Sequence, residues 1–203
     1  MAKSQLPTRE ALLLTTLQRC PAAAKALRRA KGIPGQLLPY QAAALYSLVC
    51  SYDTPGAQIL EIGTAAGYSA AVMAQAASRA QIVTVNAAGH QIPTAVENFL
   101  PWPNVQVCFA VSWELLATYD GPEIDVVFVD GDHRRALRDV PWFNRLTVGG
   151  LLLFHDYTRA GSLPVVEAVQ ALAARLERQP DVVIEDAQGV GMAGFYRRMD
   201  ETW

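Results

Sequence analysis

The chain has few cysteines, no surplus of positive charge and no long apolar run. Its three cysteines, Cys20, Cys50 and Cys108, are widely spaced and form no Cys-x-x-Cys pair, which excludes a zinc ribbon and a dithiol redox motif. Lys and Arg number 17 against 19 Asp and Glu, so the basic surplus of a dedicated nucleic-acid-binding protein is missing. No segment approaches the run of about 18 apolar residues that a membrane-spanning helix needs. We therefore expect a cytoplasmic protein with no nucleic-acid partner and no membrane partner, whose cysteines fill the core.

The chain does have ample material for a hydrophobic core. Of its 203 residues, 51% are hydrophobic and 18% are charged, which is typical of one globular domain with at most a small appendage. Short Val/Ile/Leu runs alternate with segments of helical composition, and this pattern predicts a buried parallel sheet covered by helices. The predicted strands are Gln58–Ile62, Gln81–Val85, Val105–Phe109, Ile124–Val129 and Leu151–His155, and the helices between them are 68–78, 91–99, 112–119 and 134–146.

Both ends of the chain depart from this alternation. The first 55 residues predict two helices, over about 7–31 and 39–52, which we expect to form a helical cap (1–55). After a helix over 164–178, two predicted strands, 182–185 and 192–197, are joined by a connection too short for a crossover helix and therefore pair antiparallel. The predicted fold is α/β: residues 56–203 form a Rossmann-like, doubly wound, seven-stranded, mostly parallel sheet with an antiparallel C-terminal strand, preceded by N-terminal helices.

Two glycines follow the first predicted strand, where ligands bind in open parallel sheets. Gly63 removes the side chain at a point where a ligand can approach the backbone, and Gly67 lies at the turn into the next helix. The start of that helix offers free N–H groups and a positive dipole end to an anionic group. Any strand-to-helix turn also favours glycine, so a purely structural role stays open. The spacing is not Gly-x-Gly-x-x-Gly and no Gly-Lys-Ser/Thr follows, so the dinucleotide and P-loop fingerprints are both missing.

Three segments carry a resemblance to a known family. Residues 60–70 read Leu-Glu-Ile-Gly-Thr-Ala-Ala-Gly-Tyr-Ser-Ala, residues 125–133 read Asp-Val-Val-Phe-Val-Asp-Gly-Asp-His, and residues 149–157 read Gly-Gly-Leu-Leu-Leu-Phe-His-Asp-Tyr. Together they resemble class I S-adenosylmethionine-dependent methyltransferases, in particular the small O-methyltransferases of the catechol and caffeoyl-CoA type and a bacterial branch with an Asp-Gly-Asp-His motif. The likeness implies methyl transfer from S-adenosylmethionine to a hydroxyl of a small-molecule acceptor, by an enzyme that could pair as a homodimer.

The resemblance also implies residues that bind the cofactor. Glu61, Gly63 and the backbone around Thr64 would cradle its methionine part. Tyr68 and Ser69, at the start of the helix, match positions that meet the methionine carboxylate.

The nucleoside end departs from the family pattern at two places. An acid usually follows the second strand and grips the ribose hydroxyls, but this chain has Asn86, which offers one acceptor oxygen and no charge. After the third strand, the family's Gly-Asp-Ser or Gly-Asp-Ala is replaced by Ala-Val followed by Ser112 and Trp113. Trp113 would either stack on adenine or pack at the rim. These departures keep one alternative open, a cofactor-binding protein that has lost turnover and has an interaction or regulatory role. A further alternative is a nicotinamide oxidoreductase, against which stand the missing Gly-x-Gly-x-x-Gly and the missing acid after the second strand.

Acidic and imidazole side chains gather at the predicted reacting end. Asp130 follows the fourth strand and Asp156 follows the fifth, so both should face one crevice and suit a divalent cation such as Mg²⁺. Where the catechol-type relatives read Asp-Asn, this chain has His155 before Asp156, which fits Mn²⁺, Fe²⁺ or Zn²⁺ equally well, or no metal. The alternatives are that Asp156 caps a loop and that Asp130 contacts the cofactor without a metal. His133 or His155 is the expected general base, unless His133 only starts its helix by hydrogen bonding.

Overall fold

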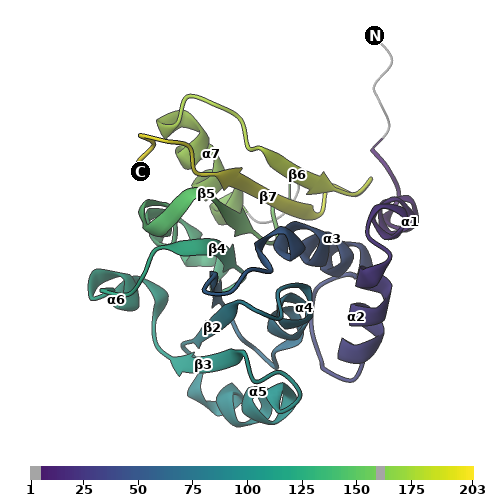
Figure 1. The fold of residues 1–203 in the computed structure, drawn as a ribbon. Coiled ribbons are helices and arrows are strands. Elements are labelled where there is room, and N and C mark those ends of the chain that lie inside the picture. Colours follow the sequence, from purple (N-terminus) through teal and green to yellow (C-terminus); the bar gives the residue numbers. More distant parts are fainter. Residues whose placement is uncertain (1–5, 159–162) are drawn as a thin grey trace.

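The computed structural model describes residues 6–158 and 163–203 and forms a seven-stranded sheet in the order β3-β2-β1-β4-β5-β7-β6 (Figure 1). Five strands run parallel, and β7 pairs antiparallel with both β5 and β6. The predicted fold class is therefore confirmed. The strands are β1 Gln58–Ile62, β2 Gln81–Asn86, β3 Val105–Phe109, β4 Ile124–Val129, β5 Leu146–Phe154, β6 Val182–Glu185 and β7 Gly191–Tyr196.

The order of the strands reverses direction beside β1. The chain moves from β1 outward to β2 and β3, and then returns to the other side of β1 as β4. Ile62 at the end of β1 pairs with Val85 on one side and with Val129 on the other, so three strand ends meet at one edge. Such a switch point leaves a crevice outside the carboxyl ends of the strands.

Helices cover both faces of the sheet, because alternate residues of each buried strand point to opposite sides. Ile59, Phe128 and Leu153 pack with α2, α3, α4 and α5, whereas Leu60 and Leu152 pack with the 3₁₀ helices η3 and η4 and with α7. The helices are α1 Arg9–Arg19, α2 Ala22–Ala30, α3 Pro39–Val49, α4 Tyr68–Ala76, α5 Ile92–Phe99, α6 Ser112–Ala117 and α7 Leu163–Arg175, with 3₁₀ helices η1 Cys50–Tyr52, η2 Gly89–Gln91, η3 His133–Arg138 and η4 Val140–Arg145.

Two predicted helices are each divided in the structure. The first ends at Arg19 because Cys20 precedes Pro21, and the α region is disfavoured for a residue before proline. Cys20 accordingly takes φ −134° and ψ 76°, which lie outside the α region. The segment predicted as one helix over 134–146 forms η3 and η4, which meet at Asp139. Pro141 follows this junction within the first turn of η4, where its missing N–H does no harm.

Two further predictions are wrong. Strand β5 begins at Leu146, five residues before the predicted start at Leu151, because the pair Gly149-Gly150 lies inside the strand rather than in a turn. Gly149 has φ +86°, and a register shift occurs where β5 pairs with β4. The prediction that the cysteines fill the core is also wrong for Cys20 and Cys50, whereas Cys108 packs against the core. Cys50 is exposed and Cys20 and Cys108 are half-buried, and all three are free thiols.

Candidate functional site

The loop after β1 requires glycine at both of its ends. Gly63 has φ +107°, and a Cβ there would collide with the backbone carbonyl oxygen of Asp130. Gly67 has φ +94°, precedes α4 as its N-cap, and would collide with the ring of Phe99 if it had a side chain. These positive φ values and close approaches favour glycine for steric reasons. The loop after β1 is therefore held directly against the end of β4.

Glu61 lies beneath this loop and is fully buried. The hydroxyls of Ser69 and Thr84 both donate hydrogen bonds to its carboxylate, and the Thr84 hydroxyl lies 2.7 Å from that of Thr64. Burial raises the pKa of Glu61 to about 8, although the two hydroxyl donors oppose this shift and the charge of Asp130 adds to it. Glu61 thus connects β1, β2 and the start of α4 from below.

Two adjoining cavities open above the loop. The first, which we call the nucleotide-side cavity, has a volume of about 450 Å³ and lies among the ends of β1, β2, β3 and β4. The second, the cap-side cavity, has a volume of about 410 Å³ and lies between the loop after β1 and the segment 34–37 that joins α2 to α3. Both are lined by Gly63, Ala65, Gln91 and Asp130.

The structure distributes the predicted cofactor residues over these two cavities. Most of them line one cavity or both. Among the described residues that line the two cavities, Glu61 is missing, because it is buried beneath the loop. The nucleotide-side cavity is lined by Gly63, Asn86, Ser112, Trp113 and Asp130, and the cap-side cavity by Gly63, Thr64, Tyr68, Ser69 and Asp130.

Asn86 uses its amide group to hold the segment that follows β2. Its Nδ2 donates to the carbonyl oxygen of Ala88 at 3.0 Å and to Oε1 of Gln91 at 2.9 Å. These bonds occupy both amide hydrogens and leave Oδ1 as the atom that can accept a hydrogen bond from a ligand. Gln91 lines both cavities and was missed in the sequence, because nothing in the stretch Gly-His-Gln marks it as part of a site.

Trp113 and Ser112 lie at the far wall of the nucleotide-side cavity. The guanidinium groups of Arg135 and Arg138 each lie 5.1 Å from the centre of the Trp113 ring, within the range of cation–π attraction. The Ser112 hydroxyl donates to Asp139, a second lining residue that the sequence did not indicate. Burial raises the pKa of Asp139 to about 6.

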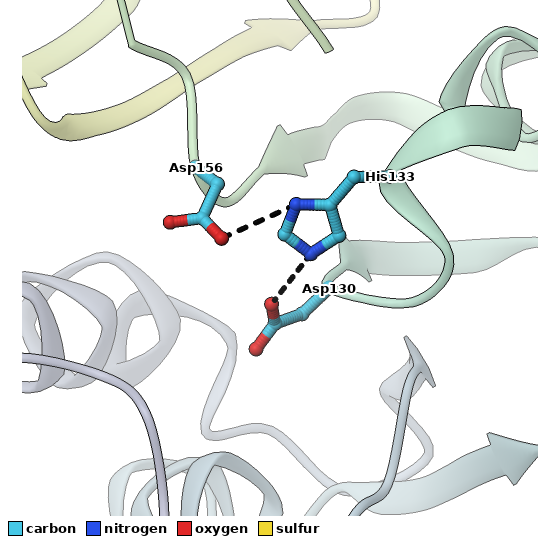
Figure 2. A group of neighbouring side chains, drawn as sticks. All are labelled: Asp130, His133 and Asp156. Atoms are coloured by element: carbon cyan, nitrogen blue, oxygen red, sulfur yellow. Dashed lines mark ion pairs between the residues drawn. The ribbon is translucent and has the colours of Figure 1, made fainter. Parts of the chain in front are cut away.

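Asp130, His133 and Asp156 converge on one point (Figure 2), and Asp130 also lines both cavities. Nδ1 of His133 lies 3.2 Å from Oδ2 of Asp156, and its Nε2 lies 3.9 Å from Oδ1 of Asp130. One ligand atom from each residue lies within 4.8 Å of the other two, and all three side chains are half-buried. The start of η3 is capped by Asp132, whose side chain accepts from the backbone N–H of Arg134, so the capping hydrogen bond of this helix comes from Asp132 and not from His133.

His155 lies behind this group and not in a cavity. Its Nδ1 is 2.8 Å from Oδ1 of Asp130, the side chain is 3% exposed, and Nε2 has no hydrogen-bond partner among the described residues. Burial alone would lower the pKa of His155, but the hydrogen bond to Asp130 and the charges of Asp130 and Asp156 raise it. Because such a buried imidazole cannot meet an acceptor, the geometry supports His133 and not His155 as the general base.

Comparison with known proteins gives a match to one family over part of the chain and a likeness in fold. Residues 60–157 match the family described as a methyltransferase domain. TomG, an O-methyltransferase from Streptomyces achromogenes involved in tomaymycin synthesis and solved with SAM, aligns with a TM-score of 0.68 at 20% identity over 87% of this chain and 89% of its own. An O-methyltransferase from Bacillus cereus in complex with SAH aligns with a TM-score of 0.65 at 18% identity over 87% and 91%. No curated protein matches the chain.

Proposed function

We propose that this chain, whose residues 60–157 form a methyltransferase domain, is an S-adenosylmethionine-dependent O-methyltransferase that acts on a hydroxyl of a small molecule. The family match spans all three motifs from which the resemblance was inferred, so the resemblance is confirmed. The observation that carries the proposal is the convergence of Asp130, His133 and Asp156 on the switch-point edge of the sheet, where Asp130 lines both cavities.

The two cavities fit the two halves of the cofactor. The nucleotide-side cavity offers Oδ1 of Asn86 to a ribose hydroxyl and the Trp113 ring to adenine. The cap-side cavity offers the backbone N–H groups of the first turn of α4, where a carboxylate is favoured. The hydroxyl of Ser69 is already bonded to Glu61, so we assign Ser69 to this site through its backbone. S-adenosylmethionine supplies an electrophilic methyl group when it is bound.

His133 is the residue placed to accept the proton of the acceptor hydroxyl. Asp156 lies at its Nδ1 and fixes the orientation of the ring, which leaves Nε2 to take the proton. Asp130 lies near Nε2 and lines both cavities, so it can hold the acceptor hydroxyl in line with the methyl group. The buried ring of His155 acts on Asp130 and keeps this carboxylate in place.

The same three residues fit a divalent cation. Two carboxylate oxygens and one imidazole nitrogen within 4.8 Å of one another form a donor set that suits Mg²⁺, Mn²⁺, Fe²⁺ or Zn²⁺. A cation bound by Asp130, His133 and Asp156 would lower the pKa of the acceptor hydroxyl. In that case His133 is a ligand and the proton leaves by another route, so sensitivity to a chelator distinguishes the two assignments.

The test combines cofactor binding with turnover. Titration calorimetry should show heat on adding S-adenosylmethionine, and a panel of catechols and other small hydroxyl compounds should yield a methylated product. We expect Asp130→Asn to lower turnover by about 100-fold or more. Asp120→Asn makes the same chemical change at an exposed loop position and should leave turnover unchanged. Absence of cofactor binding, or full turnover in Asp130→Asn, would overturn the proposal or its assignment of Asp130.

Among the described residues, no helix is long and apolar enough to cross a membrane. We propose a cytoplasmic enzyme, without a nucleic-acid partner, that forms a homodimer. We also propose a functional division into a cap (1–55) and a methyltransferase domain (56–203), supported by the contribution of segment 34–37 to the cap-side cavity.

A further inference from the structure

Asp139 is a buried acid in the wall of the nucleotide-side cavity. The residue is 2% exposed, and it lines this cavity together with Ser112 and Trp113. It lies at the junction of η3 and η4, where its backbone N–H donates to the carbonyl oxygen of Ala136 at 3.0 Å and its own carbonyl oxygen accepts from the N–H of Trp142 at 3.1 Å. The backbone of two short helices therefore fixes the position of this carboxylate in the wall.

The Asp139 carboxylate has one hydrogen-bond donor, although it could accept from several. The Ser112 hydroxyl donates to Oδ1, and within residues 6–158 and 163–203 no second donor and no cation pairs with Oδ2, which is also not enclosed. An ionised carboxylate has about four acceptor positions, and leaving a buried acceptor without a donor costs free energy. Oδ2 is therefore an acceptor that a ligand in the cavity can satisfy.

The two nearest arginines in the chain do not pair with this carboxylate. Arg135 and Arg138 belong to η3, directly before Asp139, but each guanidinium group lies 5.1 Å from the centre of the Trp113 ring. Arg135 also pairs with Asp132, with 3.5 Å between Nε and Oδ2. The arginines thus hold the Trp113 ring, and the acceptor at Asp139 stays available to a ligand.

The proposed cofactor brings a donor to this wall. In the proposed assignment the ribose meets Asn86, and the adenine base lies beyond it, toward Ser112 and Trp113. The exocyclic amine of adenine is on the side of the base away from the ribose, and it is a hydrogen-bond donor. Stacking on an aromatic ring does not distinguish one base from another, because every base has a π-face. Selection of adenine therefore needs a contact to the edge of the base.

We propose that Asp139 is the residue that selects adenine at this site, with Oδ2 accepting a hydrogen bond from the exocyclic amine. This inference rests on the proposed function, because it takes S-adenosylmethionine as the ligand of the cavity. Hypoxanthine carries a carbonyl oxygen in place of the amine, so that oxygen would face the carboxylate and be repelled. Burial raises the pKa of Asp139 to about 6, so at pH 8 the carboxyl is ionised and can only accept.

The test compares two ligands that differ only at this edge of the base, S-adenosylhomocysteine and its 6-oxo counterpart S-inosylhomocysteine. Titration calorimetry of the full chain at pH 8 should show that S-inosylhomocysteine binds about 30-fold or more weakly. In Asp139→Asn, Oδ1 can keep the bond from Ser112 while Nδ2 takes the place of Oδ2, so the preference should reverse. Asp132→Asn removes one negative charge from another residue of the same cavity and should keep the wild-type ratio of affinities.

The outcomes separate this inference from the proposed function. If neither ligand binds the wild type, the proposed function is refuted and the inference falls with it. Equal affinity of the wild type for both ligands would overturn the role of Asp139 alone. So would an Asp139→Asn variant that binds both ligands more weakly in an unchanged ratio, because Asp139 would then only hold Ser112 at the start of α6. Asp139→Ser also removes the carboxylate and decides the question by the same ratio if Asp139→Asn fails to fold.

Discussion

Replacing Glu61 with glutamine should remove the pH dependence of stability that this residue imposes. The Glu61 carboxyl is fully buried, and burial raises its pKa from 4.5 to about 8. Glutamine has the same shape and stays neutral at every pH. Its Oε1 can accept from Ser69, while its Nε2 donates to the Thr84 hydroxyl, which then donates to Thr64. The Glu61→Gln change therefore removes the titration and keeps the hydrogen-bond network.

The sign and the size follow from the two pKa values. A carboxyl whose pKa is higher in the folded than in the unfolded state stabilises the fold fully below the unfolded pKa, and this contribution is lost as the pH rises through the folded pKa. One pKa unit corresponds to about 1.4 kcal/mol, so the free energy of unfolding falls by about 3 kcal/mol between pH 4.5 and pH 7. The loss approaches about 5 kcal/mol above pH 8.

Urea unfolding at pH 5, 7 and 9 measures this loss as the difference in the free energy of unfolding between the wild type and the Glu61→Gln variant. At pH 5 the Glu61 carboxyl of the wild type is protonated and neutral, and the Glu61→Gln variant should be less stable by up to about 1.5 kcal/mol, because its amide must reverse the direction of one of the two hydroxyl hydrogen bonds. At pH 9 the order should reverse, with the variant more stable by about 3 kcal/mol. Asp139, whose pKa is also raised, is present in both proteins and cancels in the difference.

Glu97→Gln provides the control. Glu97 is exposed on α5, so this substitution makes the same chemical change at a carboxyl that is not buried. The difference in the free energy of unfolding between Glu97→Gln and the wild type should not change with pH. A flat difference for Glu61→Gln as well would show that the buried carboxyl does not hold its proton through neutral pH, and the reasoning from burial would be refuted.

Two further substitutions test the site. His155→Phe keeps a ring in a site 3% exposed but removes the hydrogen bond to Asp130, so we expect turnover to fall by about 10- to 100-fold with little change in cofactor affinity, measured by steady-state kinetics and calorimetry; unchanged turnover would contradict a positioning role. Asn86→Asp should lower the free energy of unfolding by about 1–3 kcal/mol at pH 7, measured by urea denaturation, because it removes two donors; a variant as stable as the wild type would show that these bonds contribute nothing.

The fold and the edge that carries the site were predictable because they depend on local patterns. Continuous apolar runs give buried strands, and parallel strands bring their carboxyl ends to one edge. Asp130 and Asp156 follow neighbouring strands, so their convergence was expected from the sequence before any contact was known. The place of Gln91 in both cavities was not predictable, because it depends on how the segment after β2 packs against Asn86.

The burial of His155 is an intermediate case, since the sequence held a signal for it. Side chains alternate along a strand, and Leu151 and Leu153 of β5 face the layer of α3 and α4. Continuing the alternation by one step places His155 on that same covered face, where its ring lies 6.3 Å from that of Phe128. Asp156 takes φ +53° immediately afterwards, which turns the chain and brings its carboxylate to His133. The alternation of side chains along the strand does not predict this turn of the chain at Asp156.

Asn86 shows why a departure from a family pattern is hard to interpret from one position. Judged from the sequence, Asn86 is a weaker hydrogen-bond acceptor at a position where the resembled family usually has an acid. In the structure it is a donor, matched to two acceptors, the carbonyl oxygen of Ala88 and Oε1 of Gln91. A carboxylate at this position would face both oxygens at hydrogen-bond distance and be repelled by them. Asn86 and Gln91 therefore form a pair whose members suit each other, and this wall of the nucleotide-side cavity depends on that pair rather than on the charge that position 86 lacks.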